Sequence, residues 1–351
     1  MKLVELHTKA DRLTGSYYLG YLVYQNEDLT VLIGLDDDAN ASGLILVNNQ
    51  DLVGMVEQSP SLAYCQRLID EGKSTDPFQL MPVNQELLKG NLSNFFEAGK
   101  AALFKKLPVN VTLNNGVIYS GIVTEATLEE LRIRQIDGNF ALDRIHSVIP
   151  MKQISSLEIN SALGKMWSEY QDSNIAGNPY DLVELYLDWL NDDRFGNYLL
   201  GRVLLEDDHY LLFESINDYG QLEAICLVNR DDIIHECTAS PVIDFYSFLL
   251  TRNQEAGIFD LNKLDHLAQS LDHVPSPLEV LQNAGQQLVS VDDYAAPGEM
   301  TGYIQGLTDS EVYIEDPVTG QVAPFAIDRI CTIDLASSEL EKMKEYLAAQ
   351  E

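Results

Sequence analysis

The chain has 351 residues, of which 46% are hydrophobic, so it is too long for one ordinary core and too apolar to be globally disordered. Its 22 basic and 55 acidic residues give a formal net charge of −33, which repels phosphate backbones and anionic lipid headgroups. This balance argues against a general nucleic-acid or membrane surface.

The sequence carries no sign of export or of a bound metal. The first residues contain no apolar segment followed by a cleavage site, and no apolar run approaches the length of a membrane span, so we expect neither a signal peptide nor a membrane segment. The cysteines form no CxxC pair and fit no zinc ribbon, which predicts no metal, no cofactor and a reducing, cytoplasmic location. They are Cys65, Cys226, Cys237 and Cys331.

Residues 17–57 are predicted to form a compact β-module. Short apolar segments alternate with polar turns there, and Gly20 falls in the middle of the first predicted strand. Glycine within a strand is typical of a bend or bulge that lets a short sheet curl. A helix over 62–69 is expected next, because Ser59 and Pro60 suit an N-cap and a first helical residue, and Ser240 with Pro241 suits the same role in the second half of the chain.

A second β-module is predicted over 107–150, after a helix over 84–105 that is indicated by a broad apolar stripe. Two segments with alternating hydrophobicity flank the Asn-Asn-Gly sequence at 114–116, which predicts a hairpin. Gly121 lies within the second of these strands, as Gly20 does in the first module.

The second half of the chain repeats the first. When the sequence is shifted by 181 residues, Gly20 falls on Gly201 and the register holds without a gap for about sixty positions. Gly121 falls on Gly302 at the same offset, and after a four-residue insertion Phe-Ala-Leu-Asp-Arg-Ile meets Phe-Ala-Ile-Asp-Arg-Ile. Similarity over this length indicates a tandem duplication.

The duplication predicts two units, 1–175 and 176–351. In the second unit the β-modules are expected over 198–238 and 288–335. A capping box of Ser338 and Glu341 indicates the start of a last helix. Further helices are expected over 181–190, 244–250, 261–271 and 278–287.

The module that begins at Val109, "VNVTLNNGVIYSGIVTEATLEELRIRQIDGNFALDRIHSVI", resembles the small β-barrels of Sm-like and SH3-like proteins. The resemblance implies an α+β fold with four small barrels interleaved with helices, arranged as two tandem pseudo-symmetric units. Sm proteins bind RNA through an Asp-x-aromatic-Asn signature and an Arg-Gly signature. Neither is present, because residues 124–130 are acidic and no glycine follows Arg144, so the resemblance implies no RNA-binding residue here.

Arg144 and Arg329 are candidate binding residues, because both copies of the repeat contain an Asp-Arg pair. A guanidinium fork recognises carboxylates and phosphates. The structural alternative, which we favour, is that Asp143 and Asp328 satisfy backbone donors in a turn while each arginine pairs with a neighbouring acid.

Tyr21 and Tyr24 are the other binding candidates, because they belong to a cluster of four tyrosines in the first module. Such clusters can stack nucleic-acid bases, but they usually occur with lysine and arginine. Here Glu27 and Asp28 follow, so a role in the core or in a protein contact is favoured.

No catalytic residue is predicted, because the chain lacks GxSxG, Walker A, GxGxxG and HExxH motifs. An acidic loop beginning at Asp36 resembles a calcium loop, but Ala41 and Val47 stand where an EF-hand needs glycine and glutamate. We therefore expect a solvated loop.

These observations favour a non-enzymatic, cytoplasmic binding or scaffold protein that uses tandem modules to bind protein partners. Three alternatives stay open. They are an Sm-like regulator that binds RNA or other nucleic acid, an acidic mimic of nucleic acid, and an enzyme whose site lies between the repeat units.

Overall fold

The computed structural model describes residues 1–9, 17–90, 92–137, 140–173, 177–187, 198–293 and 296–348. The chain divides into two compact units, Met1–Asn174 and Ile175–Glu351. Within the described ranges, no helix is both long and apolar enough to cross a membrane.

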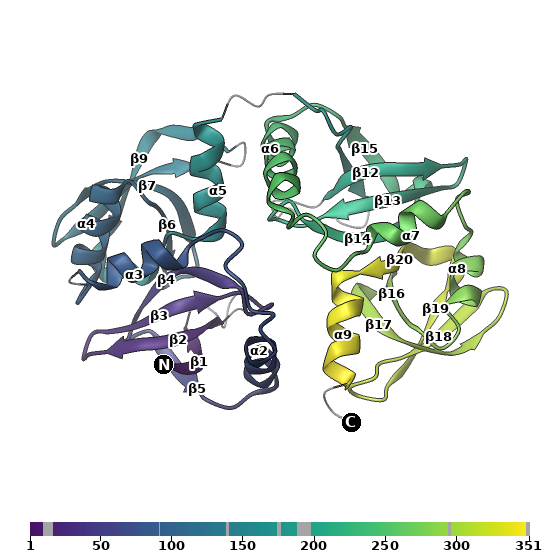
Figure 1. Ribbon diagram of the computed structural model, residues 1–351, viewed down its shortest axis with the longest axis horizontal. Coiled ribbons are helices and arrows are strands. Elements are labelled where there is room, and N and C mark those ends of the chain that lie inside the picture. The colour runs from purple at the N-terminus through teal and green to yellow at the C-terminus, as the bar shows by residue number, and fades with distance from the viewer. Residues whose placement is uncertain are drawn as a thin grey trace. The chain divides into compact units, whose positions relative to one another are not determined.

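The first unit is built on one ten-stranded antiparallel sheet with the order β5-β1-β2-β3-β4-β10-β6-β7-β8-β9 (Figure 1). Two four-stranded meanders, β1–β4 and β6–β9, make up most of this sheet. Strand β5 pairs with β1 at the edge, and β10 joins the meanders by pairing with β4 on one side and β6 on the other. The strands are β1 (Lys2–Thr8), β2 (Tyr18–Gln25), β3 (Leu29–Leu35), β4 (Ala41–Asn48), β5 (Leu52–Val56), β6 (Pro108–Leu113), β7 (Ile118–Ala126), β8 (Glu130–Ile136), β9 (Leu142–Pro150) and β10 (Ile154–Ile159).

The described helices of the first unit connect and cover the two meanders. Helix α4 packs against β7, and its Gly99 lies against Ala126 of β7 and Leu131 of β8. Helix α5 follows the joining strand β10 and contacts β6. These helices are α2 (Pro60–Asp70), α3 (Met81–Leu88), α4 (Phe95–Lys105) and α5 (Ala162–Gln171), with a 3-10 turn, η1 (Met151–Gln153), between β9 and β10.

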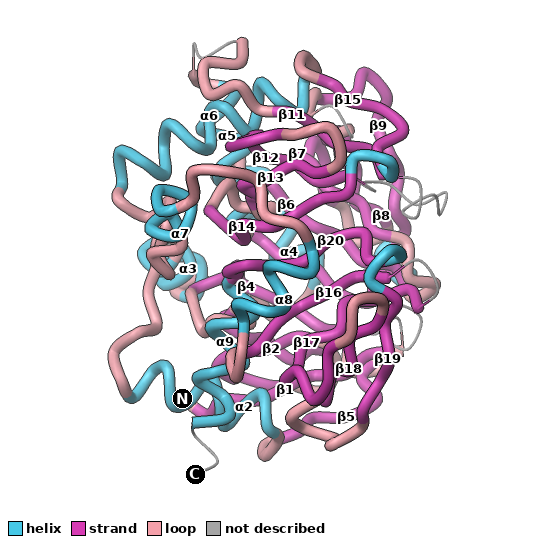
Figure 2. Tube along the Cα trace, turned by 90° about the vertical axis from the view of Figure 1, so that its right-hand side faces the viewer, coloured by secondary structure: helices cyan, strands magenta, loops and turns pink. Residues whose placement is uncertain are grey.

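The second unit has a ten-stranded sheet with the corresponding order, β15-β11-β12-β13-β14-β20-β16-β17-β18-β19, and Figure 2 shows helices and strands of both sheets along the trace. Its strands are β11 (Val183–Leu187), β12 (Tyr198–Glu206), β13 (Tyr210–Ile216), β14 (Leu222–Asn229), β15 (Ile233–Cys237), β16 (Leu288–Asp293), β17 (Ala296–Leu307), β18 (Glu311–Glu315), β19 (Val322–Ala326) and β20 (Ile330–Ser337). Its helices are α6 (Pro241–Ala256), α7 (Asp265–Ser270), α8 (Pro277–Ala284) and α9 (Ser338–Ala348), with 3-10 turns η3 (Arg230–Asp232) and η4 (Ile327–Arg329).

The prediction of four small closed barrels, and with it the Sm-like and SH3-like assignment, is wrong. The described strands form two large open sheets instead. The physical reason is the joining strand: Ile154, Leu157 and Ile159 are fully buried and share one core with Leu46 of β4 and Val111 of β6. The two meanders of the first unit therefore bury a common core, and β20 joins those of the second unit in the same way.

The mid-strand glycines mark bends, as the sequence predicted. A Cβ at each position would overlap a backbone carbonyl oxygen of the partner strand, so no larger residue fits without a backbone shift. In all four strands the pairing register shifts between the second and the fourth residue after the glycine, which is a β-bulge. These glycines are Gly20, Gly121, Gly201 and Gly302.

Several helix predictions need correction. The segment 181–190 was expected to be helical, but β11 occupies 183–187 and pairs with β12 and β15; residues 188–190 lie outside the described part. The helix expected over 84–105 is two helices, because Asn94 caps a new one by accepting from the Glu97 backbone N–H. Helix α5 and strand β10 were not predicted.

Helix starts were predicted with mixed success. The N-caps Ser59 and Ser240 are confirmed, since each hydroxyl accepts from a backbone N–H three residues on and a proline follows each. The capping box at Ser338 is wrong by one residue, because the Ser337 hydroxyl accepts from Leu340. Residues Ser276 and Glu279 form a capping box on α8 instead.

Candidate functional site

The two candidate arginines occupy different elements of their units. Arg144 lies exposed on β9, whereas Arg329 ends the 3-10 turn η4. The turn that corresponds to η4 in the first unit is η1, so the similar Asp-Arg sequences are not at equivalent places in the fold. Arg329 pairs with the buried Asp293 at 3.2 Å, the kind of structural contact that we favoured from the sequence.

The candidate tyrosines pack against the core of the first unit. Tyr21 and Tyr24 lie on β2 and contact the main hydrophobic cluster. The Tyr24 hydroxyl donates to the backbone carbonyl of Leu92, and burial raises the pKa of both phenols. Their rings therefore contribute to packing within the first meander.

The corresponding place in the second unit has different chemistry. Across β2 and β3, Tyr21 is the register partner of Ile33. Across β12 and β13, the register partners are Arg202 and Glu214. In each pair the first residue directly follows a bend glycine, so the two pairs stand at equivalent positions, one apolar and one charged.

The Arg202–Glu214 pair lines a pocket of about 450 Å³ in the second unit. Nε of Arg202 donates to Oε1 of Glu214 at 2.7 Å, and Nη2 forms an ion pair with the same oxygen at 2.5 Å. The Glu214 side chain is only 4% exposed, whereas that of Arg202 is 31% exposed. This "charged pocket" is lined by Arg202, Leu204, Leu205, Glu214, Gln254, Phe259, Asp265 and Leu271.

Opposing influences act on the Glu214 carboxyl. Its removal from water raises its pKa, the guanidinium of Arg202 lowers it, and the negative charges of Asp260 and Asp265 raise it further, for a net upward shift. Asp260 is held in place by backbone N–H groups, since its oxygens accept from Leu264 at 2.8 Å and from Asp265 at 3.1 Å. The pocket therefore holds more negative than positive charge.

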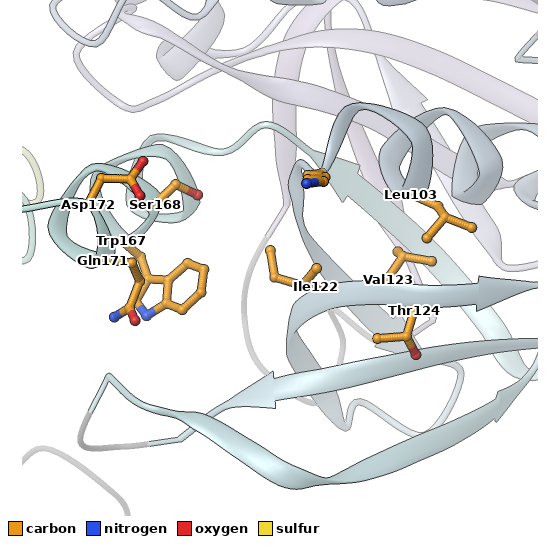
Figure 3. A pocket seen from close by; sticks show the side chains of 9 residues that line it. Leu103, Ile122, Val123, Thr124, Trp167, Ser168, Gln171 and Asp172 are labelled. Carbon is orange, nitrogen blue, oxygen red and sulfur yellow. The ribbon is translucent and has the colours of Figure 1, made fainter.

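A second pocket, of about 500 Å³, lies in the first unit between the end of α4, strand β7 and helix α5 (Figure 3). Figure 3 shows the side chains of Trp167, Ser168 and Gln171 on α5 and of Asp172 at its C-cap, facing Ile122, Val123, Thr124 and Leu103 across the opening. This "Trp167 pocket" is lined by Leu103, Lys106, Ile122, Val123, Thr124, Trp167, Ser168, Gln171 and Asp172.

Local contacts fix the walls of the Trp167 pocket. Ser161 caps α5 by accepting from the Gly164 backbone N–H, and the Trp167 indole donates to the carbonyl of Phe140 at 2.8 Å. Thr124 lies at the bulge that follows Gly121, and its hydroxyl is 2.9 Å from Nδ1 of His146. The pocket thus has apolar walls with a polar rim.

Two buried glutamates recur in both units and have a structural explanation. Glu5 accepts from the hydroxyl of Ser59, and Glu184 accepts from that of Ser240. Each serine is the N-cap of a helix, where a negative charge is stabilised by the helix dipole. These carboxylates therefore fasten helices to the first strand of each sheet.

The described residues contain no arrangement typical of metal or thiol chemistry. No group of three His, Cys, Asp or Glu side chains among them is placed to hold a metal ion. The four cysteines are free thiols. Burial, with nearby carboxylates, raises the pKa of Cys65 to about 12 and also raises that of Cys331, so both stay protonated and unreactive at neutral pH.

Trp167, Arg202, Glu214 and Asp265 were not singled out from the sequence. The available signal was the departure of the second copy from the first directly after a bend glycine, where Arg202 replaces Tyr21. Without the cross-strand register, that departure does not reveal Glu214 as its partner.

Comparison with protein-family models, with characterised proteins and with solved structures finds no match for this chain.

Proposed function

We propose that this chain is a non-enzymatic, cytoplasmic binding protein that holds a basic protein segment in its Trp167 pocket. The observation that carries the proposal is a pocket with apolar walls in a chain with a net charge of −33. Leu103, Ile122, Val123 and Trp167 suit one large apolar side chain of a partner. The field of the whole protein favours a partner with basic residues on either side of it.

An exposed aromatic residue on α4 supports a protein partner. Phe104 follows the pocket-lining residue Leu103 in the sequence, and it is 89% exposed. Burial of an exposed aromatic ring by a partner lowers the free energy of the complex, and aromatic residues are enriched at protein interfaces. Asp172 at the rim of the pocket offers a carboxylate to a basic side chain.

The alternatives have less support. The RNA-binding hypothesis came from the small-barrel assignment, which the open sheets overturn. The buried thiols stay protonated and supply no thiolate. The Thr124 hydroxyl does contact Nδ1 of His146, but no catalytic motif of the sequence includes this pair. The free cysteines support a reducing compartment.

The proposal is tested with peptides that carry one central leucine, phenylalanine or tryptophan flanked by lysine and arginine, against the same peptides flanked by glutamate. The chain has two tryptophans, so two indole N–H resonances are expected, and Trp189→Phe assigns that of Trp167. We expect the basic peptides alone to shift the Trp167 resonance in a saturable way.

Two matched variants of α5 test whether the peptide binds in the Trp167 pocket. Ser168→Phe fills the pocket and should abolish the shift, whereas Leu163→Phe adds the same ring to an exposed position outside the lining and should leave it intact. Equal response to acidic and basic peptides, or no response to any of them, would contradict the proposal. A shift that depends on protein concentration alone would show that a second copy of the chain covers the pocket.

A further inference from the structure

The charged pocket of the second unit has an acceptor that its own protein contacts leave open. The hydrogen bond and the ion-pair contact from Arg202 both go to Oε1 of Glu214. Within the described residues, Oε2 of Glu214 receives no hydrogen bond from a protein donor. Oε2 is not one of the fully enclosed polar atoms that lack a partner, so it can accept a hydrogen bond from a molecule in the pocket.

The charge of the pocket selects the sign of that ligand. Arg202 and Glu214 neutralise each other, and Asp265 adds a further carboxylate to the lining. Asp260 stands close enough to act on Glu214 as well. The net negative potential favours a cation and disfavours a carboxylate or phosphate.

The apolar side chains that line the rest of the pocket favour a ligand with an apolar stem. Leu204, Leu205, Phe259 and Leu271 line the pocket together with the charged groups. A ligand that joins a positive head to an apolar stem would satisfy both parts, since the stem removes apolar surface from water while the head reaches the carboxylates.

The fold does not require this charged pair. In the first unit the equivalent strand pair carries Tyr21 and Ile33, and both belong to the hydrophobic core. Tyr24 also packs there, at the position that corresponds to Leu205. A buried ion pair is weak evidence for stability, so its presence in only one of two equivalent places calls for another explanation.

We propose that the charged pocket binds an ammonium group carried on an apolar stem, with Glu214 Oε2 and Asp265 as its acceptors. The shared chemistry is that of a free aliphatic amine and of a lysine side chain. This site is independent of the Trp167 pocket and of the function proposed for it.

The probes are n-butylammonium, N-acetyl-lysine methylamide and the uncharged N-acetyl-norleucine methylamide, each titrated into the full chain. Binding is followed by the methyl resonances of Leu204, Leu205 and Leu271. We expect saturable shifts with the two ammonium compounds and at least about tenfold weaker binding of the norleucine compound, a difference of roughly one charge-assisted hydrogen bond. A response to the lysine compound alone identifies a peptide side chain as the source, and stronger binding of n-butylammonium identifies a free amine.

Two variants with the same change in net charge separate the pocket from the general field. Asp265→Asn should weaken ammonium binding at least about fivefold, whereas Asp208→Asn, at an exposed position outside the lining, should leave it unchanged. The proposal is overturned if the norleucine compound binds as well, if Asp208→Asn weakens binding equally, or if no probe saturates. The Trp167 resonance should not move in these titrations, so failure here is distinct from failure of the proposed function.

Discussion

The strand pair β2–β3 of the first unit and the pair β12–β13 of the second have the same register around a bend glycine and opposite chemistry. Gly20 precedes Tyr21, which lies opposite Ile33, and Gly201 precedes Arg202, which lies opposite Glu214. The backbone conformation is shared. At both glycines a carbonyl oxygen of the partner strand lies so close that a Cβ atom would overlap it.

The difference shows which features the fold demands and which it tolerates. The glycines recur in all four meanders because sterics at the bend exclude any other residue. The next position faces space that can hold a phenol ring or an ion pair, so its chemistry can change without altering the sheet. New sites are therefore expected at the residues that follow the bend.

The largest loss of stability should come from substitution of the bend glycines, which the two units share. Gly20→Ala and Gly201→Ala force a Cβ into a backbone carbonyl, so each should lower the free energy of unfolding of its own unit by about 3 kcal/mol or more. Gly54→Ala on β5 is the matched control, because no atom lies within 4 Å of its added Cβ. Hydrogen exchange followed by mass spectrometry reads each unit separately.

The outcome tests the equivalence of the two regions. Gly20→Ala should raise exchange in β2 and β3 and spare β12 and β13, and Gly201→Ala should do the reverse. If either substitution costs no more than Gly54→Ala, the bend is not under the steric control that we describe.

The next largest loss of stability should come from breaking the Arg202–Glu214 pair, which the first unit lacks. Arg202→Ala leaves Glu214 buried without its partner and should lower the free energy of unfolding by about 2–3 kcal/mol, less than for a fully buried pair because Arg202 is partly exposed. The double variant Arg202→Tyr with Glu214→Ile copies the first unit and should stay within about 1 kcal/mol of the parent chain. Urea unfolding, followed by exchange in β12 and β13, measures both.

This pair of variants sharpens the comparison. A double variant as unstable as Arg202→Ala would show that the ion pair supports the fold of the second unit. In that case its presence would need no ligand to explain it.

Local signals in the sequence predicted local features well. Ser59 and Ser240 cap helices as expected, and Asn115 and Gly116 form the predicted turn between β6 and β7. Each of these features depends on side chains and backbone groups a few residues apart, where residue preferences are strong.

Features set by long-range pairing were not predicted. Strand β10 was missed because it pairs with β4, which lies over a hundred residues earlier in the chain, and with β6, whose paired residues lie 41 to 50 residues earlier. The segment 183–187 was assigned to a helix because a short apolar run is compatible with the periodicity of a helix and with that of a strand. Its pairing with β12 and β15 makes it a strand. The charged pocket was missed for the same reason, since only cross-strand register brings Glu214 to Arg202.

The smallest effect concerns the turn between β3 and β4 and its counterpart between β13 and β14. Asp36 Oδ1 accepts from the backbone N–H groups of Asp38 and Asn40, and Asn217 Oδ1 accepts in the same way from Tyr219 and Gln221. Burial raises the pKa of the Asp36 carboxyl from 3.8 to about 6, whereas an asparagine does not titrate.

The two turns should therefore differ in their response to pH. Because folding raises the pKa of Asp36, its protonated form is favoured in the folded state, and its contribution to stability is complete below about pH 4 and lost as pH rises past 6. The loss should be about 2 kcal/mol in the first unit.

Asp36→Asn keeps the Oδ1 acceptor and should remove this dependence, whereas Asp37→Asn, at the exposed neighbouring position, should retain it. Exchange rates in β3 and β4 between pH 4 and 7, corrected for intrinsic exchange, measure the effect. An unchanged pH dependence in Asp36→Asn would mean that the buried carboxyl does not distinguish the two turns.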